Sequence, residues 1–133
     1  MSSAPSRKRP TDAELAILRV LWRHGPCTVR EVHEHLGRDT RYTTVLKFMQ
    51  IMTAKGLVLR DESQRTHTYR ARAGEEQTQK HLVKDLIARA FGGSAQKLVL
   101  HALDAAKSSP QEIAEIRRLL DQIEPDTSGE AKR

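Results

Sequence analysis

Apolar positions recur every three or four residues in the first part of the chain, which is the pattern of amphipathic helices. The first predicted helix begins at the capping box TDAE, residues 11–14, and stops at Gly25-Pro26. A second capping box, TVRE at residues 28–31, begins a shorter helix that ends at Gly37. Each helix should bury one side, formed by Leu15, Leu18, Leu21 and Trp22 in the first and by Val32 and Leu36 in the second.

A third helix is predicted from about Thr43 to Lys55, with Gly56 as its terminator. Apolar residues at spacings i, i+3, i+4 and i+7 form the side expected to face the core: Val45, Phe48, Met49 and Met52. The opposite side is polar, and its residues are Thr43, Thr44, Lys47 and Gln50, with Arg41 and Tyr42 just before the helix. The apolar side explains how the helix is held against the core. The polar side is expected to contact a binding partner.

The period of the pattern changes after the third helix. Two extended runs, Leu57–Arg60 and Thr66–Arg72, flank a polar turn and predict an exposed β-hairpin. The turn contains no glycine, so a loop of four or five residues is expected rather than a tight two-residue turn. Three helices followed by a hairpin is the order of elements in a winged helix-turn-helix.

The second half of the chain is helical again. A helix of about residues 75–91 is followed by Gly92-Gly93, by a helix capped by Ser94, and by a third capping box, SPQE at residues 109–112. The apolar stripes of these helices are too exposed for a small bundle alone, so we expect them to be buried against a second copy of the chain. An intramolecular core is the alternative. The residues expected at the dimer interface are Leu82, Leu86, Ile87, Phe91, Leu98, Val99, Leu103, Ile113, Ile116, Leu120 and Ile123.

The pattern therefore predicts a mainly α fold with a small β-hairpin, in which an N-terminal winged helix-turn-helix precedes a C-terminal helical dimerisation region. The expected divisions are a disordered basic arm at 1–10, a DNA-binding domain at 11–73, a dimerisation domain at 74–124 and a disordered tail at 125–133.

Charge is distributed unequally between the two halves. Residues 1–73 contain 14 Lys/Arg and 7 Asp/Glu, whereas residues 74–133 contain 9 and 10. All of the formal net charge of +6 therefore comes from the first half. Such an asymmetry favours a polyanionic partner for that half, with a solvated basic surface as the alternative.

Composition narrows the class of protein further. No apolar run in the 133 residues approaches the roughly 20 residues that span a bilayer, and no signal-type stretch follows the basic N-terminus. The single cysteine, Cys27, excludes an internal disulfide and fits a reducing compartment, so we expect a cytoplasmic protein. The usual phosphate-loop, dinucleotide and zinc-protease motifs are absent from the sequence, which indicates that it is not an enzyme and predicts no cofactor.

Double-stranded DNA is the polyanion that this arrangement fits. The second helix of a helix-turn-helix lies in the major groove, and its outer face contacts bases and phosphates. Hydroxyl groups, a lysine and the amides at the helix N-terminus suit that role, and the hairpin tip should meet the neighbouring backbone. The residues expected to bind DNA are Arg41, Tyr42, Thr43, Thr44, Lys47, Arg65 and His67.

Several spaced motifs now carry a family resemblance. They are TVREV at 28–32, YTTV at 42–45, KGLV at 55–58 and AFGGSAQKLV at 90–99, preceded by Leu18, Val20, Leu21, Trp22 and Gly25 and accompanied by Tyr69. Over about residues 11–123 the chain resembles the bacterial penicillinase repressor family, which includes the BlaI, MecI and CopY repressors. The resemblance implies a homodimeric repressor bound to palindromic operators.

The resemblance also implies an inducing signal, and here the sequence departs from the family. In the β-lactam branch a membrane sensor-protease cuts the repressor at an Asn-Phe bond within LVLNF. The matching stretch here is LVLHA, residues 98–102, and the chain contains no asparagine. The copper branch has a C-terminal Cys-x-Cys cluster that is also absent. The inducing signal is therefore open.

A metal- or redox-responsive winged-helix regulator is the main alternative, and a protein-interaction module without DNA binding is another. His24, Cys27, His33 and His35 lie close in sequence and are ligands suited to zinc or copper. However, His33 and His35 are two apart and point away from each other on a helix, and neither CxxC nor HxxxH is present. We therefore predict no metal site, and we expect Cys27 to be a small buried residue before the second helix.

Overall fold

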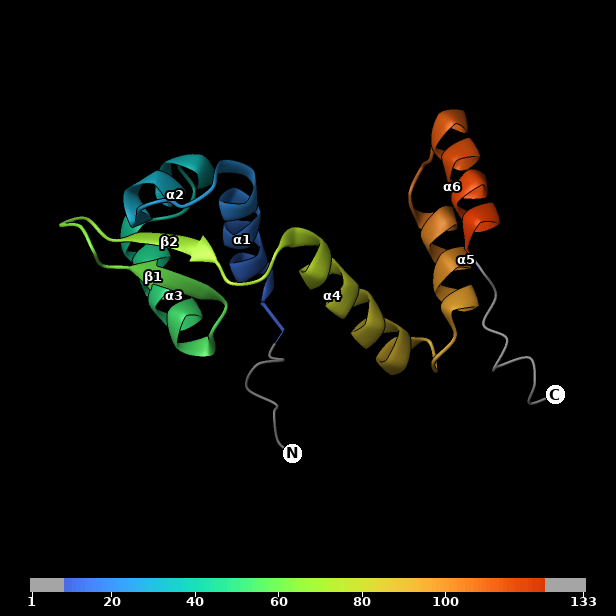
Figure 1. Cartoon of the computed structure of the whole chain (residues 1–133), viewed down its shortest axis with the longest axis horizontal. Coiled ribbons are helices and arrows are strands. Elements are labelled where there is room, and N and C mark those ends of the chain that lie inside the picture. Colours follow the sequence, from blue (N-terminus) through green and yellow to red (C-terminus); the bar gives the residue numbers. More distant parts are fainter. Residues whose placement is uncertain (1–8, 124–133) are drawn as a thin grey trace. The chain divides into compact units, whose positions relative to one another are not determined.

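The computed structural model describes residues 9–123 (Figure 1). These residues divide into two compact units between Asp85 and Leu86. Helices dominate the described part, with one small antiparallel sheet of two strands. The mainly α fold with a hairpin after the third helix is therefore confirmed. The arm and the tail expected at the two ends of the chain lie outside the described residues, apart from residues 9 and 10.

Three helices begin the first unit, and capping residues set their limits. Helix α1 spans Asp12–His24, α2 spans Val29–Leu36 and α3 spans Tyr42–Lys55. Both predicted capping boxes form, with Thr11 and Glu14 at the start of α1 and with Thr28 and Glu31 at the start of α2. Glycines end all three helices, so the first three predicted elements are confirmed with α3 one residue longer than expected.

The hairpin consists of β1, Val58–Asp61, and β2, Thr68–Ala71. Their register pairs Val58 with Ala71 and Asp61 with Thr68. The connecting loop, residues 62–67, is longer than the four or five residues expected. In Figure 1 this loop projects beyond the three helices of its unit.

A backbone bridge fixes the hairpin to the helices. The amide of Cys27 donates to the carbonyl of Tyr69 at 3.0 Å, and the amide of Tyr69 donates to the carbonyl of Cys27 at 2.8 Å. Because Cys27 directly precedes the N-cap of α2, the hairpin is tied to the start of the helix-turn-helix.

The hydrophobic core of the first unit lies between the three helices and the hairpin. Its buried members extend from Ile17 to Tyr69, and the most deeply buried include Ile17, Val32, Val45, Met49, Met52 and Val58. Ile17 was not expected on the buried side of α1, whereas Leu15 and Trp22 are only partly buried. Phe48 likewise packs against the edge of the core and is not inside it. These differences arise because apolar residues surround much of α1 and α3, and tertiary packing selects among them.

Three further helices follow: α4 spans Glu75–Ala90, α5 spans Ala95–Ala105 and α6 spans Pro110–Gln122. Ser94 caps α5, and Ser109 and Glu112 form the predicted capping box of α6. The division between the two units falls within α4, whereas the sequence places the end of the DNA-binding domain before it. Within residues 9–123, no helix is both long enough and apolar enough to cross a membrane.

Candidate nucleic-acid interface

Helix α3 has one fully buried side and one exposed side. Val45, Met49 and Met52 each have 0% of their surface exposed, so the helix is anchored by its apolar side. The outward side extends over the full length of the helix, because its residues recur at i, i+3, i+4 and i+7. These exposed residues are Thr43, Thr44, Lys47, Gln50, Ile51 and Ala54.

The N-terminus of α3 carries no side-chain cap. Arg41 occupies the N-cap position without a capping hydrogen bond, and the first turn contains no acidic residue. The N-termini of α1, α2, α5 and α6 are each capped by a serine or threonine hydroxyl. The first amides of α3 and the positive end of its dipole are thus left for another acceptor, and a phosphate group suits them.

The turn before α3 is held by an imidazole. His33 Nε2 lies 2.8 Å from the carbonyl oxygen of Thr40, and the His33 ring meets the Tyr42 ring edge-on at 5.8 Å between centroids. Both contacts join the second half of α2 to the start of α3. They position the exposed Arg41 and Tyr42 at the helix N-terminus.

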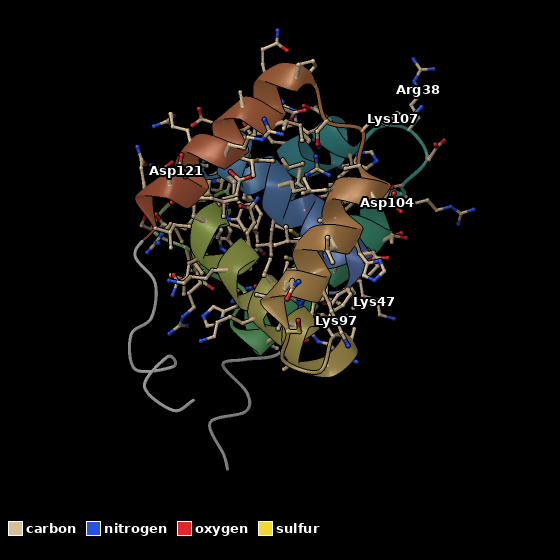
Figure 2. The ribbon with its side chains drawn as sticks, turned by 90° about the vertical axis from the view of Figure 1, so that its right-hand side faces the viewer. Arg38, Lys47, Lys97, Asp104, Lys107 and Asp121 are labelled. Atoms are coloured by element: carbon tan, nitrogen blue, oxygen red, sulfur yellow. The ribbon has the colours of Figure 1, made fainter. Side chains whose placement is uncertain are left out.

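Arg38 is a candidate that the sequence reasoning missed. It is exposed in the turn between α2 and α3, and Figure 2 shows its side chain extending away from the ribbon. A basic residue directly after the helix-ending Gly37, and therefore in the turn of the motif, was the signal that could have identified it.

The hairpin loop presents a second group of the expected residues. Arg65 and His67 are both exposed, on an element separate from α3 but in the same unit. Around them, Arg60 forms an ion pair with Glu62, and the Asp61 carboxylate accepts from the Ser63 amide at 2.9 Å. The hydrogen bond from the Ser63 backbone lowers the pKa of Asp61. Because these acids are already engaged locally, Arg65 is available for an external anion.

Of the four residues considered for metal or redox sensing, only His24 and His35 contact each other. Cys27 is 3% exposed, and burial, followed by the negative charge of Glu31, raises the pKa of its thiol, which disfavours the reactive thiolate. His33 is engaged with Thr40, while His24 and His35 stack on each other. No group of three or more potential metal ligands occurs in the described part of the chain.

The residues expected at a dimer interface all retain solvent exposure in the single chain. Helices α4, α5 and α6 contain no buried residue. The most exposed of the expected residues are Leu120, at 59%, and Ile123, at 65%. Leu86, Val99 and Leu103 are also exposed, whereas Leu82, Ile87, Phe91, Leu98, Ile113 and Ile116 are partly covered. The residues expected at the interface did not include three further exposed residues of these helices, Val83, Leu100 and Leu119.

The fold and this surface can now be compared with known proteins. The family model described as Penicillinase repressor matches residues 10–122, which include every helix and both strands of the described structure. The chain belongs to the penicillinase repressor family. The resemblance inferred from the spaced motifs is thereby confirmed.

Proteins from two bacteria are similar to this chain over most of its length. The protein named Transcriptional regulator BlaI from Mycobacterium tuberculosis is 36% identical over 117 residues, covering 85% of this chain and 83% of its own. The protein named Penicillinase repressor from Bacillus licheniformis is 23% identical over 114 residues, covering 84% of this chain and 89% of its own. The similarity thus extends through both compact units.

Proposed function

We propose that this protein is a transcriptional repressor that binds palindromic DNA operators as a homodimer and is released by an inducing signal. Membership of the penicillinase repressor family supports a repressor rather than an enzyme. The observation that carries the proposal is the two-sided helix α3. It is anchored by residues with 0% exposure, and its threonines and Lys47 face solvent.

In this proposal the exposed side of α3 enters the major groove. Lys47 reaches a guanine edge or a phosphate, while Thr43 and Thr44 contact a phosphate or a thymine methyl. The uncapped N-terminus of α3, with Arg41 and Tyr42, binds a backbone phosphate. Arg65 and His67 on the hairpin loop contact the adjacent backbone, so most of these residues position the protein and few specify sequence.

The exposed apolar residues of the last three helices support a homodimer. Leucine and isoleucine side chains exposed at 59% and 65% gain free energy when a second copy covers them. A dimer also links two DNA-binding units, which raises the operator affinity beyond that of one unit. The two half-sites are then about 34–36 Å apart, or a multiple of that distance.

Cleavage by a membrane sensor-protease is the form of release that the family resemblance favours. The matching stretch, residues 98–102, lies within α5, between Ala95 and Ala105. It has His101 and Ala102 where the β-lactam branch has the Asn-Phe bond. A protease acting here therefore recognises a different bond, and mass spectrometry of the repressor from β-lactam-treated cells would locate it.

A gel-shift titration tests the proposal directly. The full chain is titrated onto the promoter of its own operon and onto a scrambled fragment of equal length, at several salt concentrations. We expect preferential binding to the promoter, with an affinity that falls as salt rises because phosphate-bound counterions are released. Absence of association at low ionic strength would overturn the proposal.

A further inference from the structure

A pocket lies on the first unit, and its residues are distinct from those assigned to DNA. Most of its lining comes from α1. His35 at the end of α2 and Glu75 at the start of α4 complete it. The lining residues are Ala16, Arg19, Val20, Trp22, Arg23, His24, His35 and Glu75.

Two stacked imidazoles form part of the lining. The ring centroids of His24 and His35 are 3.7 Å apart, and the ring planes differ by 12°. The pKa of His24 is lowered, first by loss of hydration and then by the positive fields of His35 and Arg23. A proton on His24 is therefore disfavoured by the cations around it, and a bound negative charge would offset their fields.

Arg19 and Arg23 add two permanent positive charges one helical turn apart on α1. Neither forms an ion pair with a carboxylate in residues 9–123. Glu75 is the single acid in the lining, facing two guanidinium groups and two imidazoles. The pocket is therefore a concave surface with excess positive potential and with donors suited to carboxylate or phosphate oxygens.

The floor of the pocket is small and apolar. Val20 lies between Arg19 and Arg23 along α1, Ala16 lies one helical turn before it, and the partly buried Trp22 is also part of the lining. Trp22 itself is engaged, because its Nε1–H donates to the carbonyl of Ala73 at 3.0 Å. A ligand with a short carbon body can cover this floor while its charged groups meet the surrounding cations.

We propose that this pocket binds a small polyvalent anion that carries carboxylate or phosphate groups. Arg19 and Arg23 donate hydrogen bonds to the anion, and His24, stacked on His35, binds a proton more readily when the anion is present. The ligand contacts α1, the end of α2 and the start of α4, all within the first unit. The binding site itself does not depend on the proposed repressor function.

Calorimetry and NMR on the full chain test this site. Citrate and inorganic phosphate are titrated at constant ionic strength, with sodium chloride as the monovalent reference. We expect saturable binding of one anion per chain, together with a rise in the His24 pKa read from its imidazole proton resonances. In the R19Q/R23Q variant we expect binding about tenfold weaker or lost, because both charge-assisted donors are removed.

The matched control is Arg117→Gln, which removes an exposed arginine from α6 and should leave anion binding within about twofold of the unmodified chain. Arg19 and Arg23 are also exposed, so thermal unfolding of R19Q/R23Q should match that of the control. Lack of saturable binding, or an unchanged His24 pKa at saturating anion, would overturn the proposal.

Glu75→Gln distinguishes an anion from a metal ion. Removing this negative charge should tighten citrate binding, whereas it should weaken a metal held by His24, His35 and Glu75. Saturable Zn²⁺ binding that is lost in this variant would therefore replace the anion with a cation. If R19Q/R23Q instead lowers the affinity for every DNA sequence and reduces the salt dependence, the pocket belongs to the DNA interface and the proposal is wrong.

Discussion

At the scale of single residues, the buried ion pair between α1 and α3 is the feature with the clearest energetic role. Glu14 is only 2% exposed, and its Oε1 accepts from Lys55 Nζ at 2.7 Å and from the Thr11 amide at 2.9 Å. Burial alone would raise the Glu14 pKa, but the bonds from Lys55 and Thr11 outweigh it, so the pKa is lowered. One carboxylate thus caps α1 and fastens it to the end of α3.

We expect Glu14→Gln to destabilise the protein by about 2–3 kcal/mol, less than a fully buried pair because Lys55 keeps some exposure. A carboxyl with a lowered folded pKa stabilises the protein above its unfolded pKa, and this stabilisation is lost as pH falls through the folded value. Urea unfolding at matched protein concentration should therefore show a large deficit at pH 7 that shrinks in acid below the ordinary glutamate pKa. An equal deficit at both pH values would exclude the ion pair as its source.

A substitution of Lys47 tests the proposed DNA interface, also at the scale of a single residue. If it reads a base, Lys47→Ala should weaken operator binding by about 1–3 kcal/mol and relax the preference at one position. If it meets a phosphate, the loss should be uniform across sequences, with a smaller salt dependence. Competition gel shifts over operator variants distinguish the two cases. Lys107→Ala, an exposed lysine between α5 and α6, is the control, and an equal effect of both substitutions would remove Lys47 from the interface.

At the scale of elements, α3 depends on how it ends as well as on its buried side. Gly56 has φ 81° and ψ 18°, the left-handed conformation that non-glycine residues adopt at a cost, and its amide bonds to the carbonyl of Met52. An added Cβ at Gly56 would meet nothing closer than Arg72 at 4.0 Å. Any penalty for a side chain here is therefore conformational and not a clash.

Gly56→Ala should accordingly lower the stability by about 1 kcal/mol through backbone strain. Gly74→Ala is the matched control, because it also has open space for a Cβ but no positive φ. Thermal unfolding of the two variants measures the difference. Equal melting temperatures would mean that the end of α3 relaxes without cost.

The order of elements could be predicted from the sequence because local signals determine it. Three capping boxes and the glycines at 25, 37 and 56 placed the helix ends within one or two residues. The sequence was less informative about which residue of an apolar run is buried. Leu57, Val58 and Leu59 are consecutive apolar residues, and only the packing of β1 against the core shows that Val58 is the buried one.

The candidate sites likewise divide into one that the local sequence pattern predicts and one that depends on tertiary packing. The exposed side of α3 follows from its period, so the residues proposed to bind DNA could be named from the sequence. The pocket could not be predicted from the sequence. It combines α1 with His35 and Glu75, which come together only through tertiary packing. The contact between Glu14 and Lys55 could not be predicted either, because the two residues are 41 positions apart and meet only in the folded chain.

At the scale of the whole molecule, association is the property that the last three helices are expected to control. Leu120→Asp should break the dimer, because the interface would have to bury an unpaired charge. Ala114→Asp places the same charge on the other side of α6, and we expect it to leave the dimer intact. Sedimentation of both variants is the measurement. A dimer that persists in Leu120→Asp would mean that this stripe is not the interface.

The bond between Trp22 and Ala73 has a practical consequence. Trp22 is the only tryptophan in the chain, and its indole is hydrogen-bonded where the polypeptide passes from β2 towards α4. Its emission wavelength therefore responds to the integrity of that one junction without any attached dye. Whatever loosens the contact between α1 and the segment before α4, whether a ligand or an operator, can be followed optically in the unlabelled protein.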